Sequence, residues 1–425
     1  MSRVPSESAV PTLPATSSAK RHFAFFSTPA HGHVRPTLPI AAELVRRGHR
    51  VSYATTAQFH DDVAATGAEV LLYESTVEDL AKEVPADAED WLALALTMAV
   101  AESSALVPVL RARFPATPPD VLAYDSAMNA AGRLLARQWD RPGVEMFPVF
   151  LPQGQGVKSF SLGKLVEGAE GGNGGGGPRP AMRAFHEAMS GFLAEHGAED
   201  YSLREFAAGF GGTRLAFFPR EFQQGGELFA DHFAFVGPCL DFEAARGAWE
   251  PPTDGRRVVL VSLGTTYGNR PEFFRACVEA FADGPWHVVM TLGQNGVDPA
   301  VLEPLPANVE VHRWLPHLAV LPHAEAFVCQ AGMGSLMEAL ACGTPLVLAA
   351  HGREQVIDAG RAVELGLGVM LAPGEPSAAE VHKAVSTAAD SLEIRGRVAE
   401  MREHIRAAGG TLRAADVLER SATAG

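Results

Sequence analysis

Short apolar runs alternate with amphipathic segments from the start of the patterned part of the chain. The run HFAFFS (22–27) is typical of a buried parallel strand. The segment PTLPIAAELVRRG (36–48) has apolar residues at helical spacing and ends at a glycine, and HRVSYAT (49–55) predicts the next strand. This strand–loop–helix–strand order predicts a βαβ unit with parallel strands.

The same alternation continues along both halves of the chain. Further strands are predicted at 119–125, 143–149, 213–219, 233–238, 257–264, 286–293, 308–312, 326–329 and 344–350. Helices are predicted at 126–140, 180–197, 271–283, 332–343 and 353–368, with two more helical runs at the end of the chain. The glycine-rich stretch GGNGGGGPRP (171–180) predicts a surface loop, because so many glycines disfavour regular structure.

The pattern predicts an α/β protein built from two doubly wound parallel-sheet domains. A chain of 425 residues suits two such domains, and a Pro-Pro pair in a segment of mixed charge marks the boundary between them. The predicted parts are a disordered leader (1–20), an N-terminal domain (21–238), a linker (239–256), a C-terminal domain (257–405) and a tail helix (406–425) that packs back on the N-terminal domain.

Composition narrows the class of partner. The net charge of −15 repels nucleic-acid phosphates, so we expect no nucleic-acid partner. No apolar run reaches the length of a membrane span, and the first twenty residues lack the apolar core of a signal peptide. The four cysteines show no metal-binding or paired spacing and suit a reducing compartment. We therefore expect a cytoplasmic protein.

Two histidines stand directly after the first predicted strand, where ligands bind in parallel α/β sheets. Either His31 or His33 has the side chain best suited to act as a general base near neutral pH, although either could also serve only to cap the following helix. Asp125 ends another predicted strand. It is a candidate to orient such a histidine, and equally a candidate N-cap of the helix that follows.

Two loops in the second half also follow strands. They are SLGTTYG (262–268) and QAGMGS (330–335). Glycines in the second loop would let a ligand approach the backbone, and the free N–H groups of the next helix would suit a diphosphate. A plain turn into a helix would explain the same residues.

Taken together, these segments resemble a known family. AHGHVRPTLPIAAELVRRGHRVSYAT, VVLVSLGTT, VEVHRWLPHLAVL and QAGMGSLMEALACGTPLVLAAHGREQ resemble, in this order, the macrolide-type bacterial natural-product glycosyltransferases. The resemblance extends over about residues 21–415 and is most specific in 305–365. It implies the GT-B fold, in which two Rossmann-like domains face each other across a cleft.

The resemblance also implies a chemistry and its catalytic residues. These enzymes transfer a sugar from a nucleotide sugar to an acceptor hydroxyl with inversion, and they need neither a metal nor a cofactor. By position before Pro36, His33 is the implied base and His31 shapes the loop, while Asp125 is the implied partner of the base.

Donor contacts are implied for nine residues in the C-terminal half. Trp314 would stack on the nucleobase, Glu338 would bind the ribose hydroxyls, and Glu354 and Gln355 would contact the sugar. The diphosphate would lie near Thr265, Gln330, Gly332, Gly334 and Ser335.

Four departures from the family pattern lie on the donor side. The family usually has histidine at Gln330, aspartate at Glu354, glutamine at His317, and an Asn-Ala pair in the segment that reads VIDAG here (356–360). Glu338 favours a ribonucleotide, so we expect UDP-sugar before TDP-sugar as donor.

The expected function is therefore glycosylation of a small hydrophobic hydroxylated acceptor of polyketide or macrolide type. Self-resistance by macrolide glycosylation, and an auxiliary protein that binds without catalysis, are alternatives. A nucleotide-sugar epimerase is disfavoured, because the first βα turn lacks the G-x-G-x-x-G fingerprint. The sequence leaves the acceptor, the sugar and a homodimer open.

Overall fold

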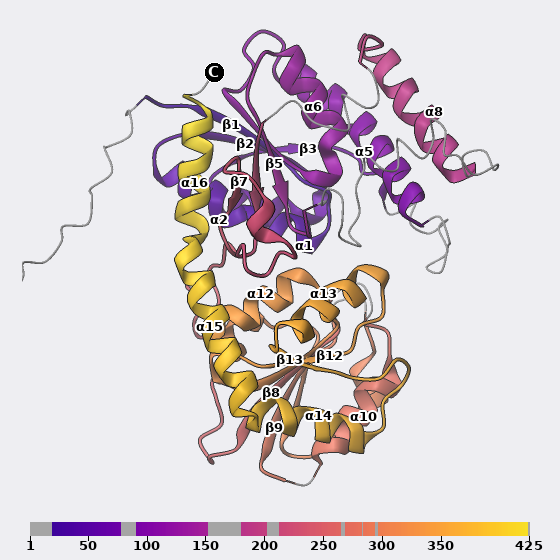
Figure 1. Ribbon diagram of the computed structural model, residues 1–425, viewed down its shortest axis with the longest axis vertical. Helices are drawn as coiled ribbons and strands as arrows, with labels where there is room; N and C mark the ends of the chain where they lie inside the picture. Colours follow the sequence, from indigo (N-terminus) through magenta and orange to yellow (C-terminus); the bar gives the residue numbers. More distant parts are fainter. Residues whose placement is uncertain are drawn as a thin grey trace, which may run out of the picture.

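The computed structural model describes residues 19–77, 91–151, 180–201, 212–264, 268–282, 284–293 and 296–423. Two domains lie one above the other, each a parallel sheet between helices, and the last two helices run along one side of both (Figure 1). The fold class predicted from the alternation of apolar runs is confirmed.

The N-terminal sheet has the strand order β3-β2-β1-β4-β5-β6-β7, with parallel neighbours throughout the described residues. The strands are β1 (His22–Phe26), β2 (Arg50–Thr55), β3 (Glu69–Leu72), β4 (Val121–Asp125), β5 (Gly143–Phe147), β6 (Thr213–Ala216) and β7 (Phe233–Phe235). The helices of this domain are α1 (His31–Val34), α2 (Leu38–Arg46), α3 (His60–Ala64), α5 (Trp91–Arg113), α6 (Asn129–Gln138) and α8 (Pro180–Glu195). Helices cover both faces, which is why β1 reads as an almost continuous apolar run.

The C-terminal sheet has the order β10-β9-β8-β11-β12-β13, again all parallel. Its strands are β8 (Arg257–Ser262), β9 (Trp286–Thr291), β10 (Val309–His312), β11 (Ala324–Cys329), β12 (Leu346–Leu348) and β13 (Gly368–Met370). Its helices are α10 (Pro271–Phe281), α11 (His317–Val320), α12 (Met333–Cys342), α13 (Arg353–Glu364), α14 (Ala378–Asp390) and α15 (Leu392–Ala408), and α16 (Gly410–Ser421) follows.

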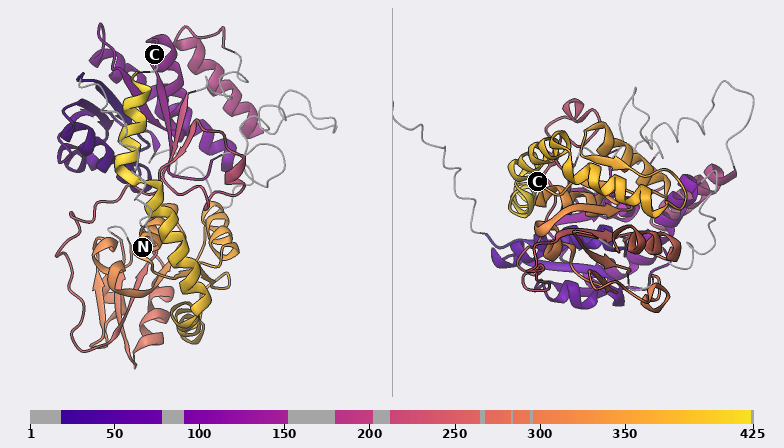
Figure 2. Two further views of the ribbon diagram at one scale, coloured as in Figure 1. Left: turned by 60° about the vertical axis from the view of Figure 1, so that its left-hand side comes forward. Right: turned by 90° about the horizontal axis from the view of Figure 1, so that it is seen from below.

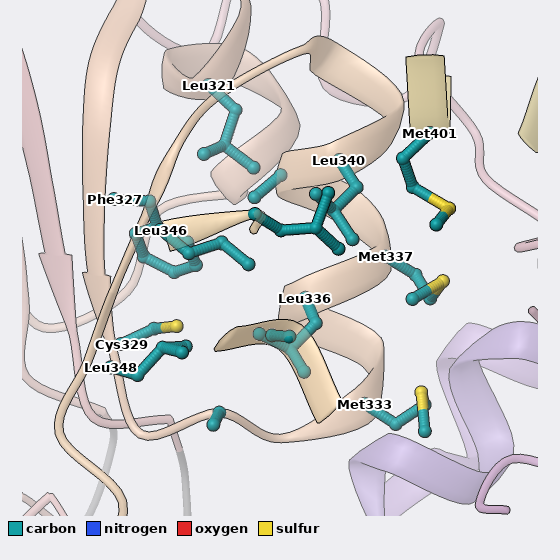
Figure 3. Packing of buried hydrophobic residues seen from close by; sticks show 14 of the residues in the cluster. Leu321, Phe327, Cys329, Met333, Leu336, Met337, Leu340, Leu346, Leu348 and Met401 are labelled. Carbon is teal, nitrogen blue, oxygen red and sulfur yellow. The ribbon is translucent and has the colours of Figure 1, made fainter. Parts of the chain in front are cut away.

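Helix α12 is held firmly between the sheet and α15. Its Leu336 and Leu340 point toward β11 and β12, while Met337 faces Met401 of α15 (Figure 3). All four side chains are at most 4% exposed. This packing fixes the start of α12, which belongs to the candidate site below.

Several elements differ from the sequence prediction. The stretch expected as a plain turn contains the short helix α1, and the next α-helix begins at Leu38 rather than at Pro36, because the turn of 3-10 helix η1 (Arg35–Thr37) intervenes. Strand β3 and helix α5 were not predicted. The expected leader (1–20) and glycine-rich loop (171–180) lie almost entirely outside the described residues.

Helix α5 is, among the described residues, the one helix long and apolar enough to cross a membrane by length and composition. It packs against α6 and α8 and carries the buried Glu102, which accepts hydrogen bonds from the hydroxyl of Tyr73 (2.7 Å) and the backbone N–H of Thr76 (2.7 Å). The core helix of a globular domain has the same composition, so this helix is weak evidence for a membrane span.

The last helix returns to the N-terminal domain. At Gly409 and Gly410 the backbone takes positive φ angles, and α16 continues from α15 onto α2 (Figures 1 and 2). Arg47 at the end of α2 donates hydrogen bonds to Asp416 (2.7 Å) and Glu419 (2.6 Å). The chain therefore connects the two domains twice, through the linker and through α15–α16.

If α16 is part of the N-terminal core, shortening a buried side chain on it will destabilise the protein. Leu418 is fully buried in the cluster around β1 and β2, so Leu418→Ala should lower the free energy of unfolding by about 2–5 kcal/mol in urea titrations. Leu412 lies on the same helix but is 58% exposed, so Leu412→Ala should change it by less than about 0.5 kcal/mol. Equal losses for the two variants would contradict this packing.

Candidate functional site

The carboxyl ends of β1 and β4 bring two loops together. The strands are paired, with Phe26 opposite Tyr124, so the residues that follow them leave the sheet side by side. His33 lies in the short helix α1 after β1, and Asp125 is the last residue of β4. Nδ1 of His33 and Oδ2 of Asp125 are 2.6 Å apart.

Asp125 does two things at once. It is 1% exposed, and its second oxygen, Oδ1, accepts a hydrogen bond of 2.7 Å from the backbone N–H of Ala127, at the start of the 3-10 turn η3 (Ser126–Met128). The structure therefore shows both contacts that the sequence suggested for Asp125, the cap of the helical turn and the hydrogen bond with a histidine. With Asp125 accepting from Nδ1–H, the other ring nitrogen of His33, Nε2, keeps its lone pair.

The environment strengthens His33 as a base. Burial works against a charged imidazole, but the charge and hydrogen bond of Asp125 and the charge of Glu354 outweigh it, so the pKa of His33 is raised above its usual value. About a quarter of the side chain remains exposed. A proton taken from a bound ligand is therefore stabilised on this ring.

Buried hydroxyl groups hold the short helix in place. Oγ of Thr37 donates to the backbone oxygen of Val34 (2.7 Å) and lies 2.7 Å from the hydroxyl of Tyr53, which in turn lies 3.3 Å from Oγ of Ser27. Burial raises the pKa of Tyr53 to about 12, so this hydroxyl stays protonated. The sequence pattern carried no signal for this support.

In the C-terminal domain, the start of α12 is open. Gly332 is its N-cap residue and no side chain caps the first N–H groups. A Cβ at Gly334, in the first turn, would meet no atom within 4 Å, and at the N-cap Gly332 the nearest atom to a Cβ would be Nε2 of Gln330, 3.8 Å away. Uncapped N–H groups at a helix start suit an anion such as a phosphate.

Gln330 lies just before this helix. It is 8% exposed, and its Oε1 is a buried atom with no hydrogen-bond partner among the described residues. A Cβ at Gly264 would lie 2.4 Å from Nε2 of Gln330, so a larger residue there would displace this side chain. Gly264 also takes a positive φ of 68°, which glycine adopts without strain.

Glu338 already has a partner. Its Oε2 lies 3.0 Å from Nδ1 of His317, and Nε2 of His317 lies 3.3 Å from Oγ1 of Thr291. Glu338 and His317 were both named in the sequence analysis, but their contact with each other was not predicted. Among the described residues, no hydrogen bond involves the other carboxylate oxygen, Oε1.

Two acidic residues one helical turn apart on α13 have raised pKa values. The side chain of Glu354 is exposed to solvent, but nearby protein reduces its hydration and raises its pKa; the charge of His33 lowers this pKa and that of Asp125 raises it. Burial, and then the charge of Glu354, raise the pKa of Asp358 well above its usual value; its Oδ2 has no hydrogen-bond partner among the described residues. Glu354 is thus within electrostatic reach of the histidine in the other domain.

Trp314 also connects the two domains. It is 38% exposed, and the guanidinium carbon of Arg35 lies 4.4 Å from its ring centroid. The ring of His31 lies 5.8 Å from the same ring. Sequence reasoning did not single out Arg35, because a contact between domains leaves no local pattern.

The structure thus brings His33, Asp125 and Glu354 within electrostatic range and places Trp314 beside the loop of His33. Gln330, Gly332, Gly334 and Ser335 lie at the start of α12. Glu338 lies in the middle of that helix, and Gln355 lies beside Glu354 on α13. Thr265 lies outside the described residues. Across the part of the chain that the structure describes, no group of three or more His, Cys, Asp or Glu side chains is arranged to hold a metal ion.

Comparison with known proteins agrees with this geometry. Residues 278–415 match the family described as "Erythromycin biosynthesis protein CIII-like, C-terminal domain". The chain is 37% identical to demethyllactenocin mycarosyltransferase of Streptomyces fradiae, over 94% of this chain and 86% of the relative. It is 34% identical to oleandomycin glycosyltransferase of Streptomyces antibioticus, over 95% and 91%. The crystal structure of CalG4, the calicheamicin glycosyltransferase, superposes with a TM-score of 0.81 at 39% identity, covering 95% of this chain and 98% of that one.

The raised pKa of His33 can be measured directly. Asp125→Asn removes the negative charge but keeps an oxygen able to cap η3, so the pKa of His33 should fall while the fold is retained. Titration of the histidine ring signals by NMR measures the shift, and His60→Ala identifies one exposed histidine as a reference. A pKa of His33 that is unchanged or higher in Asp125→Asn would contradict the assignment.

Proposed function

The chain belongs to the macrolide-type natural-product glycosyltransferases, and we propose that it transfers a sugar from a nucleoside diphosphate sugar to a hydroxyl of a small hydrophobic acceptor, with inversion at the anomeric carbon. The observation that carries the proposal is the 2.6 Å hydrogen bond between His33 and Asp125 at the mouth of the N-terminal sheet. The hydrogen bond of Asp125 to Nδ1 fixes the orientation of the imidazole ring, and so leaves Nε2 of His33 as the nitrogen that can accept a proton.

The proposed step is a direct displacement. Nε2 of His33 takes the proton of the acceptor hydroxyl as its oxygen bonds to the anomeric carbon, and the bond from that carbon to the diphosphate oxygen breaks. Asp125 stabilises the imidazolium that forms. The departing diphosphate carries negative charge, which the N–H groups at the start of α12 would stabilise in place of a metal ion.

On the donor side we propose a uridine nucleotide in preference to a thymidine nucleotide. Glu338 keeps one carboxylate oxygen free of His317, and this oxygen is the proposed acceptor for the ribose hydroxyls. Trp314 has exposed ring surface for the nucleobase. Glu354 and Gln355, at the start of α13, would contact the sugar.

The acceptor side is proposed from the same loop. A hydroxyl group within reach of Nε2 of His33 would enter from the N-terminal domain, so we place the aglycone there. As the composition of the chain suggests, we place the reaction in the cytoplasm. We favour tailoring of a polyketide-like aglycone over self-resistance or a silent binding role, because an intact base and partner would serve no purpose in a protein that only binds.

Removing the base should separate chemistry from binding. His33→Ala should lower the rate of transfer at least about 100-fold, because general base catalysis contributes at least this much, while UDP affinity measured by calorimetry stays within about twofold. His60→Ala is the matched control, since His60 is exposed and its one hydrogen-bond partner in the described part of the chain is the neighbouring Asp61. Loss of UDP affinity in parallel with the rate would assign a structural role to His33.

The ribose contact can be tested with two nucleotides that differ only in the 2′-hydroxyl. Glu338→Gln removes the charge that strengthens hydrogen bonds to the ribose, so UDP affinity should fall about tenfold and 2′-deoxy-UDP affinity less. Glu393→Gln, an exposed position on α15, is the control. Equal losses for both nucleotides would mean that Glu338 does not read the 2′-hydroxyl.

A further inference from the structure

Arg35 reaches across the cleft from the loop that carries His33. It follows α1 directly and keeps helical backbone angles, so it lies one turn after His31 on the same side of that turn. Both side chains contact Trp314 of the C-terminal domain, with Arg35 4.4 Å and His31 5.8 Å from its ring centroid. Figure 1 shows α1 at the lower edge of the N-terminal domain, facing the C-terminal domain.

Arg35 has no competing partner within the described part of the chain. No hydrogen bond or ion pair with a carboxylate fixes its guanidinium there, and the side chain is exposed. Two other exposed arginines of this domain pair with carboxylates instead: Arg46 with Glu43 and Arg50 with Glu69. The contact with Trp314 is therefore the interaction that orders Arg35.

An aromatic ring offers two faces. A planar guanidinium stacks well on one face, because the ring's negative potential attracts the cation, and this leaves the other face available. Trp314 is still 38% exposed with Arg35 and His31 in place, so open ring surface remains for a nucleobase.

We propose that Arg35 is a positioning residue that uses Trp314 to bring the loop of His33 over a bound nucleotide. The inference rests on the proposed function, in which the nucleobase stacks on Trp314. A nucleobase stacked on one face of Trp314 and Arg35 stacked on the other stabilise the same orientation of the indole ring. His33 lies only two residues before Arg35 on a loop held by Thr37 and Tyr53. The contact between Arg35 and Trp314 therefore also places the imidazole of His33 against the donor.

The coupling is reciprocal by thermodynamic necessity. If Arg35 holds the domains together around Trp314, then the nucleotide binds more tightly to the form in which His33 is in place. Donor binding would thus assemble the catalytic site, and an empty donor site would leave His33 less well positioned.

The test is a double-mutant cycle on UDP binding, measured by calorimetry with the full chain. Arg35→Ala should weaken UDP binding about two- to fivefold, the range of an exposed cation–π contact, and should raise the KM for the donor and lower kcat. Arg35→Lys keeps the cation and should restore most of both. Arg275→Ala on α10, an exposed arginine that pairs with Glu272, should change neither. The midpoints of thermal unfolding of the wild type and of these three variants should agree closely.

In the Trp314→Ala background, Arg35→Ala should cause no further loss of UDP affinity. A loss as large as in the wild type would overturn the inference, because Arg35 would then act without Trp314. Tighter UDP binding in Arg35→Ala would also overturn it, since Arg35 would then occupy the nucleobase face. A wild type that binds no UDP, or a Trp314→Ala protein that binds it unchanged, would instead count against the proposed donor site itself.

Discussion

The hydrogen bond between His33 and Asp125 is the interaction on which the proposed chemistry depends. It joins the ends of two neighbouring strands, and the sheet fixes its geometry because β1 and β4 are paired in register. The same carboxylate caps the next helical turn, so its position is determined twice. The result is an oriented, partly buried imidazole with a raised pKa, which suits the proposed role of His33 as the base.

The proposed donor half of the site lies on the other domain, so the proposed chemistry depends on how the two domains are placed. The open start of α12, the carboxylate of Glu338 and the ring of Trp314 belong to the C-terminal domain, and His33 belongs to the N-terminal domain. The linker and the helices α15 and α16 connect the two domains, and α16 packs into the N-terminal core. With these two connections, the two domains could close around a bound donor while each domain keeps its own core packing.

Much of the fold could be predicted from the sequence, because buried parallel strands such as β1 and β8 are apolar runs with clear ends. Helix α5 was missed: it is apolar on nearly all sides, so it lacks the periodicity that marks an amphipathic helix. Asp125 was predictable because it ends a strand, and the loop of His31 and His33 because it follows one; the family resemblance, and not the local pattern, distinguished His33 from His31. The pairing of His317 with Glu338, and that of Arg35 with Trp314, depend on segments 21 or more residues apart and leave no local pattern.

The most direct test of the account is the pH dependence of kcat/KM for transfer, since this ratio reports the ionisation of the free enzyme. A raised pKa means that His33 stays protonated to a higher pH, and a protonated ring cannot accept the acceptor's proton. We predict an acidic limb in which the rate rises with pH through a pKa above 6.5, the ordinary value for histidine, and matches the pKa of His33 measured by NMR. A rate that is constant across this range would contradict the assignment of His33 as the base.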